Sequence, residues 1–427
     1  MTSRRSDERH DGLKSPQSTA VTMRLRQGVL WSVVATCTIF ILGIILAQFH
    51  LSWLWDVPDE FTYDWRTALF SEVASDQRKD IALVLIDDNS VARYWSRSPV
   101  DRGLIAELVK AVDAAQPRAI GLDFVFDRRS EPSRDTELAK AIKGAIAPVI
   151  LGVTTKREGP IDQANLDRQD EFISDTGDPE PRPAGTLFFG EQEGGITLGD
   201  NVIRAMGAPD KGNKYNKTFD MLLAGLDGQK NMPANHLISW LLPPKNKKSD
   251  MFTTLHISTH DPVDGTGDGH TVLPNYLHAA LKNKIVIIGG DFIDRDQHRI
   301  PLSVETKAPA SGAFIHAQII AQLIDKRAII KVPPICEVGI DLLICLVAFL
   351  ISSRYFLFGI ELFSHFVFLV AIVLTGFFLF SEWSIVLTTS TMAAGWVLGI
   401  IGGGHYERIA PLMMAPLLWM VKKRSAK

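Results

Sequence analysis

Apolar residues gather in four long runs, one near the N-terminus and three near the C-terminus. From Gly28 to Phe49 no charged residue interrupts the chain, and about 20 apolar residues are enough to cross a bilayer as a helix. We predict four transmembrane helices, at residues 28–49, 334–351, 355–380 and 383–402. They flank a block of mixed polar and apolar sequence at residues 50–333.

Positive charges indicate how these helices are oriented. They lie in the tail at residues 1–27, at Arg354 between the second and third runs, and in the C-terminal KKRSAK. If the four helices alternate in direction, all three groups share one side, which the positive-inside rule assigns to the cytoplasm. Both tails, 1–27 and 403–427, are then cytoplasmic, and the block at 50–333 is extracytoplasmic. A cleaved signal peptide is the alternative for the first run, but no A-x-A site closes it.

Within the block at 50–333, short apolar runs alternate with helical patterns. Strands are predicted at 81–86, 118–127, 148–155 and 284–290, and helices at 104–112, 135–145 and 313–326. Asp135 is the expected cap of the second helix, and the charged, proline-rich segment 157–185 is expected to be a surface insertion. Continuous apolar strands between amphipathic helices favour a parallel sheet covered on both faces. The predicted fold class is therefore an α/β domain with a parallel sheet, joined to four transmembrane helices.

Acidic residues follow three of the predicted strands. They are Asp87 and Asp88, Asp123 and Asp127, and Asp291 and Asp294, with His298 close behind the last pair. Ligands of parallel sheets bind beyond the carboxyl ends of the strands, so these side chains are candidate ligand contacts. Their oxygens would suit calcium or magnesium, and a histidine with two carboxylates would also suit zinc or iron. The alternative is that the aspartates only end strands and cap the helices that follow.

The remaining composition narrows the possible chemistry. Cys37 and Cys345 lie in apolar runs and Cys336 lies at the edge of one, so no disulfide is expected in the block at 50–333. The sequence contains no P-loop or dinucleotide fingerprint and no distinct pairing of nucleophile and base. We therefore expect neither an enzyme nor a cofactor. A net charge of -3 gives no indication of nucleic-acid binding.

Three ionisable residues fall within the predicted membrane helices: Asp341, Glu361 and His365. Glu361 and His365 are four residues apart and share a helix face. Ionisable groups in a bilayer are costly and usually pair, line a polar path or bind a partner. Glu361 near the inner interface, with its carboxylate reaching the headgroups, is the alternative.

Glycines repeat every four residues in the last run, at Gly395, Gly399 and Gly403. Small residues at this spacing let two helices approach closely. Two readings remain open at this point. The glycines could pack against other helices of the same chain, or they could support a homodimer or a partner helix.

Several segments resemble one family in order and spacing. They are FTYDWR at 61–66, VLIDDNSV, AIGLDFVFD with DTELAKAI, LKNKIVIIGG with Asp294 downstream, and GAFIHAQIIAQLI before the last three runs. Over about residues 50–402 the chain resembles the type 2 CHASE domain, an extracytoplasmic sensory module of bacterial histidine kinases and nucleotide cyclases. ITLGDNVIRAMG resembles the family's aspartate and arginine segment. His316 matches a family position, as a ligand contact or as a hydrogen-bonded histidine at the sheet edge.

The resemblance implies signal reception outside the cell and transmission inward. Typical members continue into a kinase, cyclase or phosphatase, whereas only about 20 residues follow Tyr406 here, so a separate partner is expected to supply the output. We expect a multi-pass protein of the bacterial inner membrane whose periplasmic domain binds a small ligand or ion. The alternatives are a structural or accessory subunit of a cell-envelope complex and a metal-dependent periplasmic hydrolase. The sequence leaves the ligand, the partner and the oligomeric state open.

Overall fold

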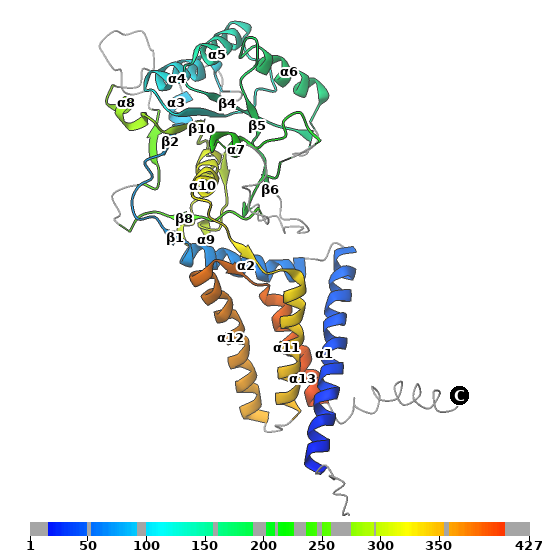
Figure 1. Ribbon diagram of the computed structural model, residues 1–427. Coiled ribbons are helices and arrows are strands. Elements are labelled where there is room, and N and C mark those ends of the chain that lie inside the picture. The colour runs from blue at the N-terminus through cyan, green and yellow to red at the C-terminus, as the bar shows by residue number, and fades with distance from the viewer. Residues whose placement is uncertain are drawn as a thin grey trace, which may run out of the picture. The chain divides into compact units, whose positions relative to one another are not determined.

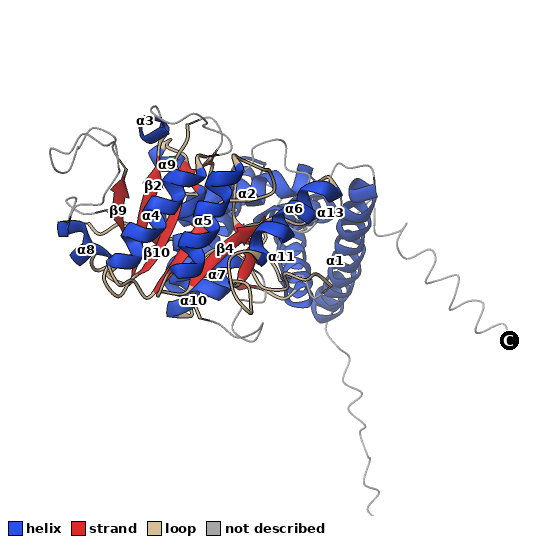
Figure 2. Ribbon diagram, turned by 90° about the horizontal axis from the view of Figure 1, so that it is seen from above, coloured by secondary structure: helices blue, strands red, loops and turns tan. Residues whose placement is uncertain are grey.

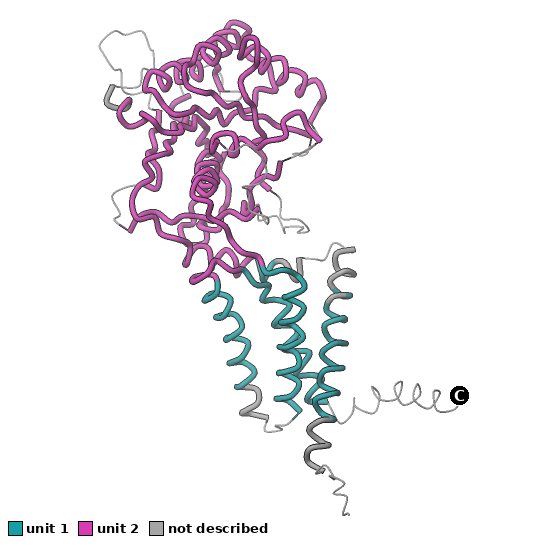
Figure 3. Tube along the Cα trace, viewed as in Figure 1, with its two compact units in different colours: residues 1–59, 332–379, 386–427 teal, residues 60–331, 380–385 magenta. Residues whose placement is uncertain are grey.

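The computed structural model describes most of the chain, and Figure 1 shows it with its elements labelled. The described residues are 16–48, 53–91, 100–156, 161–190, 202–209, 212–225, 236–245, 250–257, 275–293, 296–353 and 358–405. They form two compact units, coloured separately in Figure 3. Unit 1 comprises Met1–Asp59, Val332–Leu379 and Val386–Lys427, and unit 2 comprises Glu60–Lys331 and Phe380–Ile385.

A six-stranded parallel sheet forms the centre of unit 2. Its order is β5 (Ala184–Thr186), β4 (Val149–Val153), β3 (Ala119–Asp123), β10 (Ile285–Gly290), β2 (Ile81–Ile86) and β9 (Thr253–His256). All neighbouring pairs run parallel. Every residue of β2 and β10 is buried, because helices cover both faces, and this is why the strands are uninterrupted apolar runs. The predicted parallel α/β domain is confirmed.

Alternate strand residues pack against different helices. One core joins the sheet to α4 (Arg102–Ala114), α5 (Pro132–Gly144), α6 (Gln163–Ser174) and α8 (Asn275–Leu281). The other core joins it to α7 (Phe219–Leu223) and α10 (Gly312–Asp325). Figure 2 shows α4 and α5 crossing over the strands. Because side chains alternate along a strand, Ile120 and Leu122 face α4 and α5, which directs Asp123 to the side of α7 and α10.

Two local expectations were wrong. Asp135 does not cap α5: the helix begins at Pro132, Glu131 occupies the cap position, and Asp135 lies in the first turn. Proline is well suited to that first position, because its missing N–H would have no partner there. The segment expected as a surface insertion contains α6, whose Phe172 and Ile173 are buried in the core.

The shorter elements belong to unit 2, except for Val386 of β14, which belongs to unit 1. They are β1 (Glu72–Val73), α3 (Asp88–Val91), β6 (Phe189–Gly190), β7 (Ala205–Met206), β8 (Leu241–Leu242), β11 (Gln297–His298), α9 (Ser303–Thr306), β12 (Ala310–Ser311), β13 (Ile330–Lys331) and β14 (Ile385–Val386). The strands form two-stranded pairs: β1 with β8, β6 with β7, β11 with β12, and β13 with β14. The helix α2 (Trp53–Phe70) was not predicted, since Pro58 and five acidic or basic residues interrupt its apolar pattern.

Unit 1 is helical. It contains α1 (Pro16–Gln48), α11 (Pro334–Ser352), α13 (Thr389–Gly404) and most of α12 (Phe358–Trp383). The helix α11 packs against both α1 and α13. Among the described residues, two helical segments are long and apolar enough to cross a membrane, Pro334–Ser352 and Phe363–Trp383. Membrane attachment is supported by these two helices, and the count of four spans stays a prediction.

Candidate functional site

Three of the predicted acidic positions lie at one edge of the sheet. The strands β3, β10 and β2 are neighbours, so their carboxyl ends bring the backbones of Asp123, Asp291 and Asp87 together. The Asp291 N–H donates a hydrogen bond to the Ile86 carbonyl at 2.9 Å, which ties the ends of β10 and β2. The side chains of these aspartates have different partners, so the strand ends do not form one common cluster.

Asp87 and Asp88 stabilise the turn after β2. Asp87 Oδ1 accepts hydrogen bonds from the Ser90 backbone N–H at 2.8 Å and from Ser90 Oγ at 2.7 Å, which caps α3. Asp88 Oδ2 accepts a hydrogen bond from the Ile293 N–H at 3.4 Å. Both contacts correspond to the structural role that the sequence left open as the alternative to ligand binding.

Asp291 and Asp127 also have separate neighbours. Asp291 Oδ1 accepts a hydrogen bond from Gln297 Nε2 at 2.5 Å, and the negative charge of Asp127 acts on the buried Arg102. Asp294 lies outside the described residues. Within the described ranges, no group of three or more histidine, cysteine, aspartate or glutamate side chains is arranged to hold a metal ion.

Asp123 belongs to a buried charged group that the strand-end pattern only partly indicated. His316 on α10 is 1% exposed, and its Nδ1 lies 2.8 Å from Oδ1 of Asp220 on α7. Its Nε2 lies 3.7 Å from Oδ1 of Asp123. The imidazole therefore stands between two carboxylates that come from different elements, and we call these three residues the Asp–His–Asp group.

Local sequence explains how this group is assembled. Thr218 accepts a hydrogen bond from the Met221 N–H and begins α7, while Ser311 accepts one from the Phe314 N–H and begins α10. Gly289 lets α10 approach the sheet, because a Cβ there would lie 2.8 Å from the Ala313 Cβ and 3.0 Å from Asp123 Oδ2. The two caps set where α7 and α10 begin, and Gly289 lets α10 lie close to the sheet. The side chains of Asp220, His316 and Asp123 are thereby brought close to one another.

Burial and charge shift the pKa values of this group. Burial, and then the charge of Asp220, raise the pKa of Asp123, while the charge of His316 opposes the rise. Burial alone would lower the pKa of His316, but the charges of Asp220 and Asp123 outweigh it and raise the pKa. Burial and the charge of His316 lower the pKa of His298. The carboxylates of Asp220 and Asp123 thus favour the protonated form of His316, whereas burial and the charge of His316 disfavour the protonated form of His298.

Two phenylalanine rings lie beside His316. The Phe189 ring centroid lies 4.6 Å from that of His316 and 5.7 Å from that of His298. The Phe219 ring lies 5.1 Å from that of His316. The low dielectric of this buried site strengthens its ionic contacts. The arrangement can hold a proton and fix α10 against α7 and β3, whereas an exchangeable ligand would need a more open site.

Sequence reasoning missed the acidic partner of His316. Asp220 stands alone in the apolar segment FDMLL, and no spacing rule connects it to His316, which lies 96 residues away.

A second buried ionic group contains Arg204. Only the family resemblance had indicated this residue, which lies in the segment ITLGDNVIRAMG. Arg204 Nε and Nη2 each lie 2.8 Å from an Asp64 carboxylate oxygen, and Arg204 Nη1 lies 3.2 Å from Glu60 Oε2. Glu60 and Asp64 are one turn apart on α2.

The helix α10 also holds the segment that enters β8. Gln318 donates to the Leu241 carbonyl at 3.0 Å and accepts from the Leu241 N–H at 3.1 Å. Gln322 accepts from the Ser239 N–H at 2.7 Å and donates to the Leu237 carbonyl at 3.0 Å. Two side chains of one helix thus satisfy backbone groups that a neighbouring strand would otherwise pair.

The ionisable residues of unit 1 have polar or aromatic neighbours. Asp341 is 6% exposed and accepts a hydrogen bond from Thr391 Oγ1 at 3.4 Å. His365 Nε2 lies 3.1 Å from Ser352 Oγ, on the neighbouring helix α11. Glu361 lies in α12, but its side chain is outside the described part. Asp341 and His365 therefore each have a polar partner within unit 1, Thr391 and Ser352 respectively. Any role in a polar path stays a prediction.

The three glycines of α13 lie against α11. A Cβ on Gly399 would come within 2.4 Å of the Cys345 carbonyl oxygen, and one on Gly403 within 2.4 Å of the Phe349 carbonyl oxygen. At Gly395 the corresponding distance to the Asp341 carbonyl oxygen is 3.4 Å. The glycine face is thus occupied by a helix of the same chain.

Comparison with known proteins adds a family to this geometry. The family model for the CHASE2 domain matches residues 35–351 of the chain. No curated protein and no solved structure matches the chain. The matched region includes every element of the parallel sheet and the Asp–His–Asp group. The chain therefore belongs to the CHASE2 domain family, a family of extracytoplasmic sensory domains.

Proposed function

We propose that this protein is a sensory protein of the bacterial inner membrane. Its extracytoplasmic α/β domain binds a small ligand or ion and passes a signal through the membrane helices to a separate partner protein. The observation that carries the proposal is the position of α10, which holds His316 in the buried Asp–His–Asp group. The chain continues from Asp325 at the end of α10 to Pro334 at the start of α11.

The contacts of α10 support a role in transmission. At its start His316 is fixed by Asp220 and Asp123, and further along Gln318 and Gln322 hold the segment that enters β8. A ligand that favours another position of α10 would have to replace several of these buried contacts together, which favours two discrete arrangements over gradual movement. The shift can be no larger than the difference in the ligand's affinity for the two arrangements.

The proposed topology has four membrane helices with both tails in the cytoplasm. It rests on the apolar composition of α1, α11, α12 and α13 and on the positive charges that flank them. In this arrangement unit 2 faces the periplasm and a partner protein receives the signal on the membrane or cytoplasmic side.

The test is purification of the full-length protein after crosslinking in cells, with partners identified by mass spectrometry. We expect a kinase, cyclase or phosphatase among them. His316→Gln, which removes the imidazole between the carboxylates of Asp220 and Asp123, should change the activity of that partner. His256→Gln is the matched control, because the His256 side chain is 53% exposed. Recovery of only envelope or secretion components would contradict the proposal and favour a structural subunit.

A further inference from the structure

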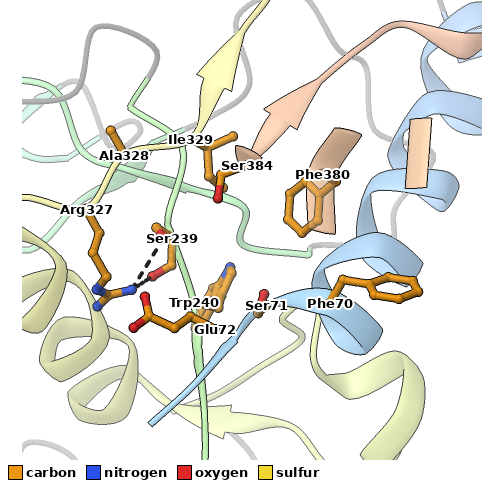
Figure 4. A pocket seen from close by; sticks show the side chains of 10 residues that line it. All are labelled: Phe70, Ser71, Glu72, Ser239, Trp240, Arg327, Ala328, Ile329, Phe380 and Ser384. Carbon is orange, nitrogen blue, oxygen red and sulfur yellow. Dashed lines mark hydrogen bonds between the residues drawn. The ribbon is translucent and has the colours of Figure 1, made fainter. Parts of the chain in front are cut away.

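A cavity of about 190 Å³ lies in unit 2, beyond the C-terminal end of α10. Its walls come from the end of α2, the approach to β8, the segment after α10 and the end of α12 (Figure 4). One water molecule needs only about 15 Å³ measured in this way. The cavity is therefore large enough for a small organic molecule, and it is separate from the Asp–His–Asp group.

Two buried donors on residues that line this cavity have no hydrogen-bond partner among the described residues. They are the indole N–H of Trp240, which is 1% exposed, and Nη2 of Arg327. The other guanidinium nitrogens of Arg327 are used: Nη1 donates to the Ser239 carbonyl and Nε donates to Asp325 Oδ2 at 3.2 Å. Figure 4 shows the indole nitrogen of Trp240 directed into the space between Ser239 and Phe380. Buried donors of this kind are normally paired.

The chemistry of these donors selects a class of ligand. A carboxylate offers two acceptor oxygens and a negative charge, which match an indole N–H together with one arm of a guanidinium. The exposed Glu72 also lines the cavity, and its negative charge acts on Arg327. Glu72 would repel a simple anion but would attract an ammonium group beside the carboxylate. We infer that the cavity binds a small zwitterion that carries a carboxylate and an adjacent ammonium group, as α-amino acids do.

A ligand in this cavity would lie beside the segments that connect unit 2 to the apolar helices. Arg327 and Ile329 lie between α10 and α11, and Phe380 and Ser384 lie at the end of α12. The Ile330 N–H donates a hydrogen bond to the Ser384 carbonyl at 2.8 Å, so these two connections are already joined. This inference names a ligand class for the proposed sensory function. Binding in the cavity does not depend on that function; only the signal that binding would produce depends on it.

The test is calorimetric titration of the full-length protein in lipid nanodiscs with L-alanine, propionate and propylamine. L-alanine should bind, and the other two compounds should bind at least about ten-fold more weakly, since each lacks one charged contact. Trp240→Phe removes only the indole N–H and should weaken L-alanine binding by roughly ten-fold or more. Trp396→Phe is the control, because that indole nitrogen also has no partner among the described residues but lies in α13 of unit 1.

A second variant keeps the test decisive if Trp240→Phe does not fold. Ala328 is exposed and lines the cavity, so Ala328→Phe should fill the space and abolish L-alanine binding. The inference is overturned if L-alanine shows no saturable binding up to roughly 10 mM, if propionate binds equally well, or if the variants bind like the wild type. Binding of L-alanine without any change in partner activity would support this site and contradict the sensory role. A change in partner activity in His316→Gln, together with no binding of L-alanine, would support the sensory role and contradict this site.

Discussion

At the scale of single residues, burial and charge oppose each other at His316. It is almost fully buried, yet two carboxylates hold its pKa above the ordinary value of about 6.5. A pKa raised by folding means that the protonated form stabilises the native state. That contribution is fully present below the unfolded pKa and is lost as the pH rises through the folded pKa.

Replacement of Asp220 tests this charge balance. Asp220→Asn removes the nearer carboxylate, so the pKa of His316 should fall, and the loss of stability with rising pH should be smaller and end at lower pH. The ring-proton NMR signals of His316 report the pKa, and urea unfolding at several pH values reports the stability. Asp170→Asn, at a carboxylate in an exposed ion pair with Lys214, is the control. An unchanged His316 titration in Asp220→Asn would show that the two side chains do not interact as described.

Arg204 provides a second test at this scale. Arg204→Met leaves Glu60 and Asp64 buried without their cation, and such a change is expected to lower the free energy of unfolding by about 3–5 kcal/mol. Lys110→Met breaks an exposed ion pair with Glu137 and should cost less than about 1 kcal/mol. Urea titration of both variants gives the comparison. Equal losses of unfolding free energy in the two variants would mean that the buried ionic group stabilises the protein no more than an exposed ion pair does.

Some features of the candidate site could be predicted from sequence and others could not. Asp87, Asp123 and Asp291 were expected to meet at one edge, because parallel strands end at the same side of a sheet, and their backbones do. Which way each carboxylate points depends on helices that pack later. The partners of Arg204 and His316 lie 140 and 96 residues away in the chain, and no local pattern connects them.

At the scale of elements, the buried strands were the most predictable part. The run at 81–86 coincides with β2, and the helix expected at 313–326 coincides with α10 within one residue at each end. Both have strong apolar signals because both are buried. The helix α6 was missed because only Phe172, Ile173 and Gln169 among its residues are buried and charged residues surround them. A short apolar face in a charged segment is too weak a pattern to distinguish a helix from a loop.

The contact between α13 and α11 gives a prediction about the helical unit. Gly399→Ala places a methyl group 2.4 Å from the Cys345 carbonyl oxygen, and overpacking of this kind costs about 1–3 kcal/mol. Gly404→Ala is the matched control, since no atom lies within 4 Å of its added Cβ. Thermal unfolding in nanodiscs should show a lower midpoint for Gly399→Ala only. The same midpoint in both variants would contradict the close packing of α13 on α11.

At the scale of the whole molecule, the central claim is that a change in the sensory domain reaches the membrane helices. The physical basis is a single helix, α10, that carries His316 in the sensory unit and is followed in the chain by α11. The two buried ionic groups and the cavity beyond α10 are the features of unit 2 that could favour one arrangement over another. Family membership supports a sensory role, and transmission through the helices remains the proposal to be tested.

Hydrogen–deuterium exchange of the full-length protein in nanodiscs tests this claim most directly, with Asp220→Asn compared with the wild type and with Asp170→Asn. Asp220 is buried in unit 2, and its partner His316 belongs to the same unit. We predict altered protection in α10 and also in α11 and α13 for Asp220→Asn, and no change in these helices for Asp170→Asn. A change confined to α7 and α10, with α11 and α13 exchanging as in the wild type, would contradict transmission through α10.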